Sequence, residues 1–220
     1  MKIWLLTLSL LATPAAATDG VTTRGKLSDS DFHALATCGA AKGKSCQGPS
    51  VRWPQAQVTL AMHPDTGGMD RALSARVSQA VDAAITAING VGAGVRLVRD
   101  DRKRNPNILL RRVKLREGDR TKGIPNVPDN EAIGVGYSTV WWQKNRDLTK
   151  ATILISAYIQ PRDVASVVLE EVFQSLGFRY DVEGSYYQTR SILAQDSNAT
   201  TQIKGQDAAI LRLHYPPLNN

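Results

Sequence analysis

The chain has 220 residues, of which 42% are hydrophobic and 21% charged, and its net charge is +7. This length and composition suit one globular domain and exclude a disordered, low-complexity or repeat-built chain. The positive charge admits an acidic partner, but much of the excess lies in residues 99–122, where acidic residues are interspersed and no aromatic residue offers a stacking surface for bases. We therefore expect residues 99–122 to form a solvated loop with an edge strand, and we expect no nucleic-acid partner.

The first 17 residues have the pattern of a signal peptide. Lys2 precedes an apolar run over residues 3–11, and "ATPAAA" then supplies the small residues of a cleavage site. The apolar run is shorter than the roughly 20 residues that span a bilayer. We expect cleavage after Ala17, a mature protein that is periplasmic or secreted, and no stable membrane insertion.

Residues 18–50 are expected to form an N-terminal extension of the main domain. Residues 18–30 are polar and are predicted to be mobile, and residues 28–38 are predicted to form a short helix. The two cysteines, Cys38 and Cys46, lie in "TCGAAKGKSC". Because export places them in an oxidising compartment, we predict a disulfide between them. The alternative is a metal knuckle, for which no histidine or third cysteine lies nearby.

The main domain, residues 51–220, is predicted to mix strands and helices. Residues 57–62 alternate apolar and polar side chains, as a half-buried strand does. Apolar residues at steps of three or four over 69–88 predict a long helix, which "NG" at 89 and 90 would end. Further strands are predicted at 94–98, 107–115, 132–143 and 151–159, the last buried on both faces, and further helices at 163–177 and 205–215. The fold class is α+β: a single domain with a mixed, twisted sheet, a long backing helix, a central helix and a C-terminal helix.

The central helix carries an unusual group of polar residues. Glu170 and Gln174 lie four residues apart on one face, and Glu171 lies about 100° further round. Nearly all other positions are apolar, with Asp163 as the expected N-cap and Gly177 as the left-handed end. Two interpretations fit this pattern: the polar residues mark the solvent side of an ordinary amphipathic helix, or they line a cleft.

The segment "EEVFQSLGFRY" and the order of elements around it resemble the zincin metalloproteases, the metzincin branch especially. Those enzymes carry H-E-x-x-H-x-x-G-x-x-H on the corresponding helix. In that register Glu170 stands at the first histidine and Glu171 at the general-base glutamate. Gln174 and Tyr180 stand at the second and third histidines. "RSIL" and "QDAAILRLHY" look like the family's turn beneath the metal and its final helix. The chain is more similar still to an exported bacterial family of unknown function that carries E-E-x-x-Q-x-L-G in place of the zinc motif.

The three histidine positions of the zinc motif therefore hold Glu, Gln and Tyr in this chain. Zinc prefers imidazole and thiolate ligands, and an amide is a poor substitute. These departures imply a domain without catalytic zinc and without another resident cofactor. Calcium stays open as an alternative, because four side chains would offer it oxygen donors: Glu170, Glu171, Gln174 and Asp181.

The resemblance and the missing ligands together predict a non-catalytic protein of the periplasm or cell envelope. The former substrate cleft would be a recognition groove for an extended peptide, bound by strand addition at a sheet edge, or for another envelope protein. A hydrogen-bond network that aligns Glu170 or Glu171 through Gln174, Ser191 or Arg190 would also hold the loop after the central helix to the C-terminal helix. The residues expected in the cleft are Gln174, Tyr180, Asp181, Tyr187 and Ser191.

The alternative function is hydrolysis by paired carboxyl groups. Glu171 and Glu170 would act as base and acid in a peptidase-like or glycosidase-like reaction, with or without a non-zinc cation. Adjacent helical residues point about 100° apart, so these two do not by themselves flank one bond. A second acid across the cleft, such as Asp181, would complete the pair.

Overall fold

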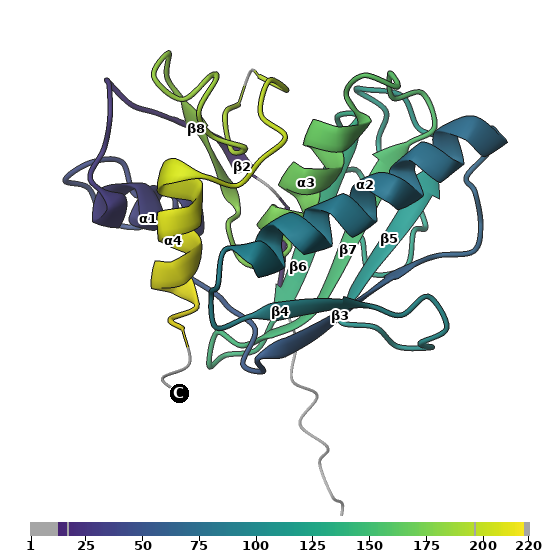
Figure 1. Ribbon diagram of the computed structural model, residues 1–220, viewed down its shortest axis with the longest axis horizontal. Coiled ribbons are helices and arrows are strands. Elements are labelled where there is room, and N and C mark those ends of the chain that lie inside the picture. Colours follow the sequence, from purple (N-terminus) through teal and green to yellow (C-terminus); the bar gives the residue numbers. More distant parts are fainter. Residues whose placement is uncertain (1–12, 17, 196, 218–220) are drawn as a thin grey trace, which may run out of the picture.

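The computed structural model describes residues 13–16, 18–195 and 197–217 (Figure 1). The predicted signal peptide therefore lies outside the described residues except for 13–16. The described chain has an α+β fold with one six-stranded sheet, one two-stranded sheet and four helices. None of the described helices combines the length and the apolar character that crossing a membrane requires.

The large sheet combines parallel and antiparallel strands. Its strands are β1 (Thr13–Ala16), β3 (Gln57–Met62), β4 (Arg96–Arg99), β5 (Ile108–Val113), β6 (Gly136–Trp142) and β7 (Leu148–Ser156). They lie in the order β1-β6-β7-β5-β3-β4. The four strands from β7 to β4 are parallel, whereas β6 is antiparallel to β7, and β1 is antiparallel to β6. The sheet is thus mixed, as predicted, with its antiparallel part at one side.

Two helices, α2 (Arg71–Gly90) and α3 (Val164–Gln174), pack against each other on one face of the large sheet (Figure 1). α2 contacts β4, while α3 contacts β6 and β7. The apolar stripe predicted for α2 is buried, with Val77, Val81 and Ile88 inaccessible to solvent. The same periodicity that predicts the helix therefore also fixes which side of it meets the core.

The predicted end of α2 is wrong. Asn89 and Gly90 still belong to the helix, and the left-handed residue that follows is Gly92, with a φ of 74°. The Asn89 side chain instead accepts a hydrogen bond from the backbone N–H of Leu97 at 2.8 Å and donates one to its carbonyl at 2.9 Å. Asn89 thereby ties the end of the helix to the edge strand β4.

The opposite face of the sheet is covered, near β6 and β7, by the segment that connects β5 to β6. Val127 and Ile133 of this segment pack with Tyr137 and Leu154 in a small buried cluster. β7 is therefore buried on both faces, as predicted from its continuous apolar run.

Alternation along β6 and β7 assigns each residue to a face. Ile153 belongs to the main core beneath the helices, whereas Leu154 faces the small cluster on the other side. Ser138 is the strand partner of Ile153, and Tyr137 is the partner of Leu154. Because directly opposed residues share a face, Ser138 and also Gly136, two residues before it, lie on the helix side.

A smaller layer is built from β2 (Thr18–Thr22), α1 (Asp29–Cys38), β8 (Tyr180–Glu183) and α4 (Gly205–His214) (Figure 1). β2 pairs in parallel with β8, and α1 packs against both α4 and β8. The prediction that residues 18–30 are mobile is wrong, because Val21 and Leu27 are buried in the core. Two apolar residues in a polar segment are enough to hold it when a strand and a helix lie beside them.

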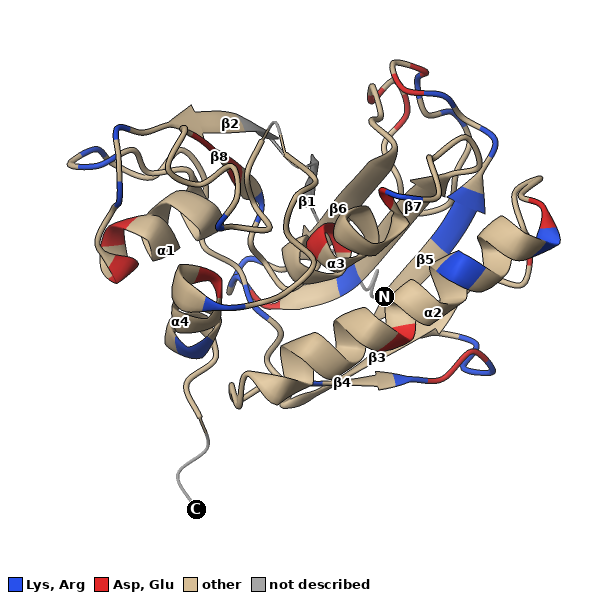
Figure 2. Cartoon of the chain, turned by 45° about the horizontal axis from the view of Figure 1, so that its top comes forward, with Lys and Arg blue, Asp and Glu red and all other residues tan. Residues whose placement is uncertain are grey.

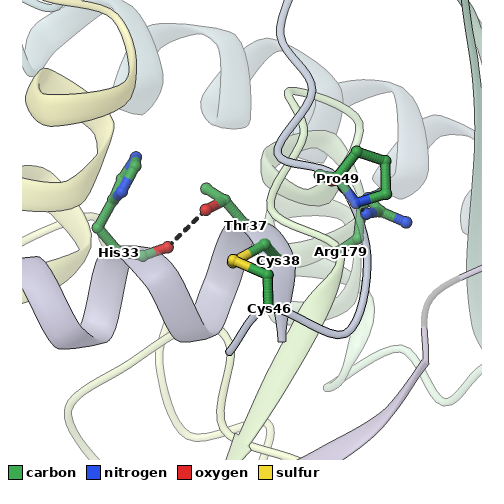
Figure 3. The surroundings of a disulfide bond; sticks show 6 residues. All are labelled: His33, Thr37, Cys38, Cys46, Pro49 and Arg179. Carbon is green, nitrogen blue, oxygen red and sulfur yellow. Dashed lines mark hydrogen bonds between the residues drawn. A yellow bond between two sulfur atoms is a disulfide. The ribbon is translucent and has the colours of Figure 1, made fainter. Parts of the chain in front are cut away.

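The predicted disulfide between Cys38 and Cys46 is confirmed (Figure 3). Its loop begins at the last residue of α1, and the backbone N–H of Gln47 donates to the Cys38 carbonyl at 2.8 Å. Arg179 then donates to the Pro49 carbonyl at 2.6 Å. The disulfide loop and the start of β8 are therefore joined.

The arginine-rich residues 99–122 are placed differently from the prediction. They contain β5, which is an interior strand between β7 and β3, while the edge strand of that side is β4. Arg112 on β5 donates to the Ser74 hydroxyl of α2, and Arg99 on β4 forms an ion pair with Asp82 at 2.9 Å. An interior strand tolerates arginine where its long side chain reaches a polar partner beyond the core.

Candidate functional site

An acidic pocket of about 380 Å³ lies between α3, the start of β6, β8 and the segment before β6. Its lining residues are Glu117, Glu131, Ala132, Gly134, Val135, Gly136, Tyr137, Val167, Glu170, Glu171, Gln174, Asp181, Gln195 and Asn198. Five of these are carboxylic acids, and no described lysine, arginine or histidine lines the pocket. Acidic residues of α3 stand beside β6 in Figure 2. An acidic pocket is thus set into a chain whose net charge is +7.

The polar residues of α3 face this pocket and not open solvent. Glu171 and Gln174 are 6% and 3% exposed, and Glu170 is partly exposed within the pocket. The apolar positions of the helix pack into the main core. Asp163 occupies the expected N-cap position but makes no capping hydrogen bond with its side chain. The interpretation of these residues as the solvent side of an amphipathic helix is therefore wrong.

A hydrogen-bonded chain of side chains connects β6, α3 and β8 across the pocket floor. The Ser138 hydroxyl donates to Gln174 Oε1 at 3.0 Å, and Gln174 Nε2 donates to Asp181 Oδ1 at 2.8 Å. Glu171 Oε2 and the Tyr137 hydroxyl are buried and have no hydrogen-bond partner among the described residues. The amide of Gln174 is therefore satisfied at both ends, while one oxygen of Glu171 is not.

Gly136 leaves the space that Glu171 occupies. A Cβ atom at this position would lie 2.4 Å from Glu171 Oε1 and 2.5 Å from Val167 Cγ1. Both distances are far inside van der Waals contact, so only glycine allows α3 to approach β6 this closely. This close approach explains Gly136 in the stretch "AIGVGYS".

Burial raises the pKa values of the three innermost carboxyl groups. The pKa of Glu171 rises to about 8, through burial first; the Ser138 hydroxyl acts in the opposite direction, and the charge of Asp181 adds to the rise. Burial also raises the pKa of Asp181 to about 7, against the hydrogen bond from Gln174. The pKa of Glu170 lies well above its usual value because of burial and then because of Asp181 and Glu171. At neutral pH Glu171 is therefore mostly protonated and Asp181 partly so, whereas free carboxyl groups would be ionised.

Tyr180 does not join the pocket, although the sequence places it with the cleft residues. A Cβ atom on Gly39 would lie 2.4 Å from its ring, and one on Gly48 would lie 2.7 Å from its hydroxyl. Tyr180 thus packs against the disulfide loop, whereas the next residue along β8, Asp181, faces the pocket. Alternation along a strand sends neighbours to opposite sides.

Tyr187 and Ser191 lie in a second pocket of about 420 Å³, whose other lining residues are Lys26, Asp29, Tyr186, Arg190, Lys204, Gly205 and Gln206. The Tyr187 hydroxyl accepts the backbone N–H of Leu27 at 3.0 Å. The Ser191 hydroxyl donates to Asp207 at 2.7 Å, and burial raises the pKa of Asp207 to about 7. The single predicted network is therefore two separate ones. Gln174 bonds to Asp181 of β8, whereas Ser191 bonds to Asp207 of α4.

A buried histidine pair escaped the sequence analysis. His214 Nε2 lies 2.9 Å from the Val51 carbonyl and so donates to it, which leaves His214 Nδ1 to accept from His33 Nε2 at 3.1 Å. Burial lowers the pKa of His214 to about 4 and also lowers that of His33. The two residues are 181 positions apart, and no spacing rule connects residues at that separation.

The remaining pocket residues also could not be found by motif. Glu117 and Glu131 enter from the segment that precedes β6, and Ser138 enters from β6 itself. In the described part of the chain, no group of three or more His, Cys, Asp or Glu side chains is arranged to hold a metal ion. The arrangement as it stands offers acceptor oxygens and buried, exchangeable protons.

The class of protein is thus an α+β domain with a disulfide-bonded N-terminal layer and an acidic pocket between its central helix and an antiparallel strand of the large sheet. The model of the family described as "Protein of unknown function (DUF2927)" matches residues 32–218, and the chain belongs to that family. No curated protein matches it.

Proposed function

We propose that the chain is an exported binding protein that holds an extended peptide along β6, on a zincin-like fold that has lost its zinc ligands. The observation that carries this proposal is the strand already lying on β6. Thr13–Ala16 pairs antiparallel with Thr139–Trp142, in continuous register from Thr13 opposite Trp142 to Ala16 opposite Thr139. The outer side of β6 thereby accepts an extended chain.

Processing of the proposed signal peptide after Ala17 would remove β1 and open this edge. An open edge strand presents unpaired backbone N–H and C=O groups, and strand addition satisfies them. The start of β6 borders the acidic pocket, because Gly136 and Tyr137 line it. A peptide on β6 would therefore run past the pocket, with backbone bonds supplying affinity and the pocket supplying selectivity.

The order of elements supports the zincin-like part of the proposal. A strand, a long helix, several strands, the motif helix and a C-terminal helix follow one another as in the enzymes that the sequence resembles. Of the three positions that correspond to zinc ligands, Glu170 and Gln174 line the pocket, whereas Tyr180 packs against the disulfide loop. Three side chains that do not converge on one point favour binding over metal-dependent catalysis.

Hydrogen exchange on β6 tests strand addition. The probe is the capped peptide Thr-Pro-Ala-Ala-Ala-Ala-Ala-Ala, whose first four residues copy β1, added to protein purified after processing. Protection is expected at those amides of 139–142 that point away from β7, which are every second residue of the strand. The matched control is a chain that begins at Thr13 and keeps β1, in which these amides are protected without peptide and the probe adds nothing. If these β6 amides stay unprotected at a saturating concentration of the probe, the strand-addition proposal is wrong.

A second candidate, hydrolysis, is favoured by one observation: Glu171 and Asp181 share a pocket, and their pKa values, about 8 and about 7, suit a general acid or base at neutral pH. Mass spectrometry of the probe peptides after incubation with the protein distinguishes the candidates. Cleavage that disappears in Glu171→Gln would favour the enzyme. Intact peptides that remain bound favour the binding protein.

A further inference from the structure

The acidic pocket is lined by acids without a base, and one of its acceptor oxygens has no hydrogen-bond donor among the described residues. Every ionisable group that lines it is an acid: Glu117 and Glu131 before β6, Tyr137 on β6, Glu170 and Glu171 on α3, and Asp181 on β8. The lining contains no base among the described residues. A ligand that enters this pocket therefore meets mainly carboxyl and amide groups and no fixed positive charge.

One of these acceptors is unsatisfied inside the protein. Glu171 is 6% exposed, and its Oε2 atom has no hydrogen-bond partner among the described residues. The Ser138 hydroxyl donates to Gln174 and a Gln174 N–H donates to Asp181, and neither donor reaches Glu171 Oε2. A buried acceptor without a donor carries a cost in free energy that a ligand N–H removes. The pocket is thus short of a donor, and preferably of a charged one.

We propose that the pocket binds the positively charged side chain, lysine or arginine, of the extended peptide that lies on β6. This inference rests on the proposed function, because the peptide is what carries the charge to the pocket. Ammonium and guanidinium groups supply several N–H donors and no acceptor, which complements the lining. A pocket of about 380 Å³ is large enough for either group.

The register of β1 identifies which peptide residue would carry the charge. In that register the first peptide residue lies opposite Trp142 and the fourth opposite Thr139. Continued by three residues, it places the sixth opposite Tyr137 and the seventh opposite Gly136. Gly136 lies on the helix side, against Glu171, whereas Tyr137 packs in the cluster on the other side and reaches the pocket only as part of its rim. A basic residue at position seven would therefore reach Glu171, and one at position six would not.

Binding of a cation here is linked to protons. A positive charge stabilises the ionised carboxylates, so it lowers their pKa values and displaces the protons that burial retains. Because the pKa values of Asp181 and Glu171 are about 7 and about 8 in the free pocket, affinity should rise between pH 6 and pH 9. The ammonium of lysine, whose ordinary pKa is about 10.4, stays charged over that range.

Two isomeric capped peptides test the proposal with the processed protein. Thr-Pro-Ala-Ala-Ala-Ala-Lys-Ala carries lysine at position seven, and Thr-Pro-Ala-Ala-Ala-Lys-Ala-Ala carries it at position six. Norleucine at position seven gives a neutral side chain of the same shape. Calorimetry at pH 8 should show the first peptide binding about tenfold or more tightly than the other two, as expected for a charge-assisted hydrogen bond. Its heat should also depend on the buffer, because protons are released.

Variants of the pocket residues test whether the pocket causes the preference for lysine over norleucine at position seven. Glu171→Gln and Asp181→Asn should each remove most of the gap between the lysine and norleucine peptides, while the all-alanine probe still binds and so reports an intact fold. Glu183→Gln, on the same strand but outside the pocket lining, is the matched control and should keep the gap.

The outcomes separate the two proposals. Equal affinity for lysine and norleucine at position seven, with β6 still protected, overturns the charged-side-chain proposal and leaves strand addition standing. Failure of every peptide overturns strand addition; n-butylammonium, titrated alone, then decides whether Glu171 still selects a cation. Displacement of the lysine peptide by micromolar CaCl₂ overturns the proposal in favour of a metal site.

Discussion

Replacing Glu171 with glutamine should change how the stability of the protein depends on pH. Burial holds the pKa of Glu171 at about 8 in the folded protein, against 4.5 for a free carboxyl group. Below about pH 4.5 both folded and unfolded chains keep the proton, so the group has no pH-dependent effect. Between pH 4.5 and 8 the unfolded chain releases its proton first, and the free energy of unfolding falls. Above pH 8 the loss is complete.

The size of this loss follows from the pKa difference of about 3.5, at roughly 1.36 kcal/mol for each pKa unit. It is on the order of 5 kcal/mol, an upper limit because the neighbouring carboxyl groups share the titration. Glutamine does not titrate, so Glu171→Gln should abolish this loss. Any cost of fitting the amide is independent of pH and cancels when two pH values are compared.

The assay is urea unfolding of both proteins at pH 4.5 and pH 9. The free energy of unfolding of Glu171→Gln minus that of the parent should be larger at pH 9 than at pH 4.5 by several kcal/mol, because only the parent loses stability as pH rises through the titration of Glu171. Glu117→Gln, at an exposed residue of the same pocket, is the control and should show little change between the two pH values. A difference between Glu171→Gln and the parent that is the same at both pH values would refute the reasoning.

Three further predictions concern the stability contributed by Gly136, by the disulfide and by His214. Gly136→Ala should lower the free energy of unfolding by about 1–3 kcal/mol, because its Cβ would overlap Glu171; unchanged urea midpoints would contradict this. Replacing Cys38 and Cys46 with serine should cost about 2.5 kcal/mol from the loss of a short closed loop, measured by urea unfolding against the disulfide-bonded parent; the reduced parent should match the variant, and a variant as stable as the oxidised parent would contradict this. His214 is held neutral with its pKa lowered to about 4, so its own contribution to stability should be lost as pH drops from 6.5 to 4, by about 3 kcal/mol at most. The buried carboxyl groups titrate in both proteins, so the measured quantity is the stability of the parent minus that of His214→Gln in thermal unfolding; this difference should fall over that range, and a constant difference would contradict the assignment.

Local patterns in the sequence predicted the elements well where one face decides burial. The apolar stripe over 69–88 and the continuous apolar run at 151–159 both gave the right type of element, because periodicity reports directly on the face that meets the core. Their ends differ by a few residues from those observed, α2 (Arg71–Gly90) and β7 (Leu148–Ser156). Ends depend on single side chains such as Asn89, which bonds to a distant strand.

Properties that depend on pairing between distant segments were not predictable. The arginines of β5 suggested an edge strand, but strand order places β5 inside the sheet. Helical spacing grouped Glu170, Glu171 and Gln174 correctly at one pocket, whereas Tyr180 was assigned by a motif register that its strand does not follow. The carboxylates that complete the pocket come from a segment with no regular periodicity, so only the folded chain brings them together.

The hydrogen bond from Arg179 to the Pro49 carbonyl, just after the disulfide loop, gives that loop an influence beyond its own stability. Figure 3 labels both residues beside the disulfide. The loop supports Tyr180 from one side, and the next residue, Asp181, accepts the hydrogen bond from Gln174 on the other. Oxidation of two cysteines therefore sets the position of a strand whose following residue completes the pocket floor. A chain still in a reducing compartment would hold that strand less firmly. The floor of the acidic pocket should therefore be held most firmly once the Cys38–Cys46 disulfide has formed.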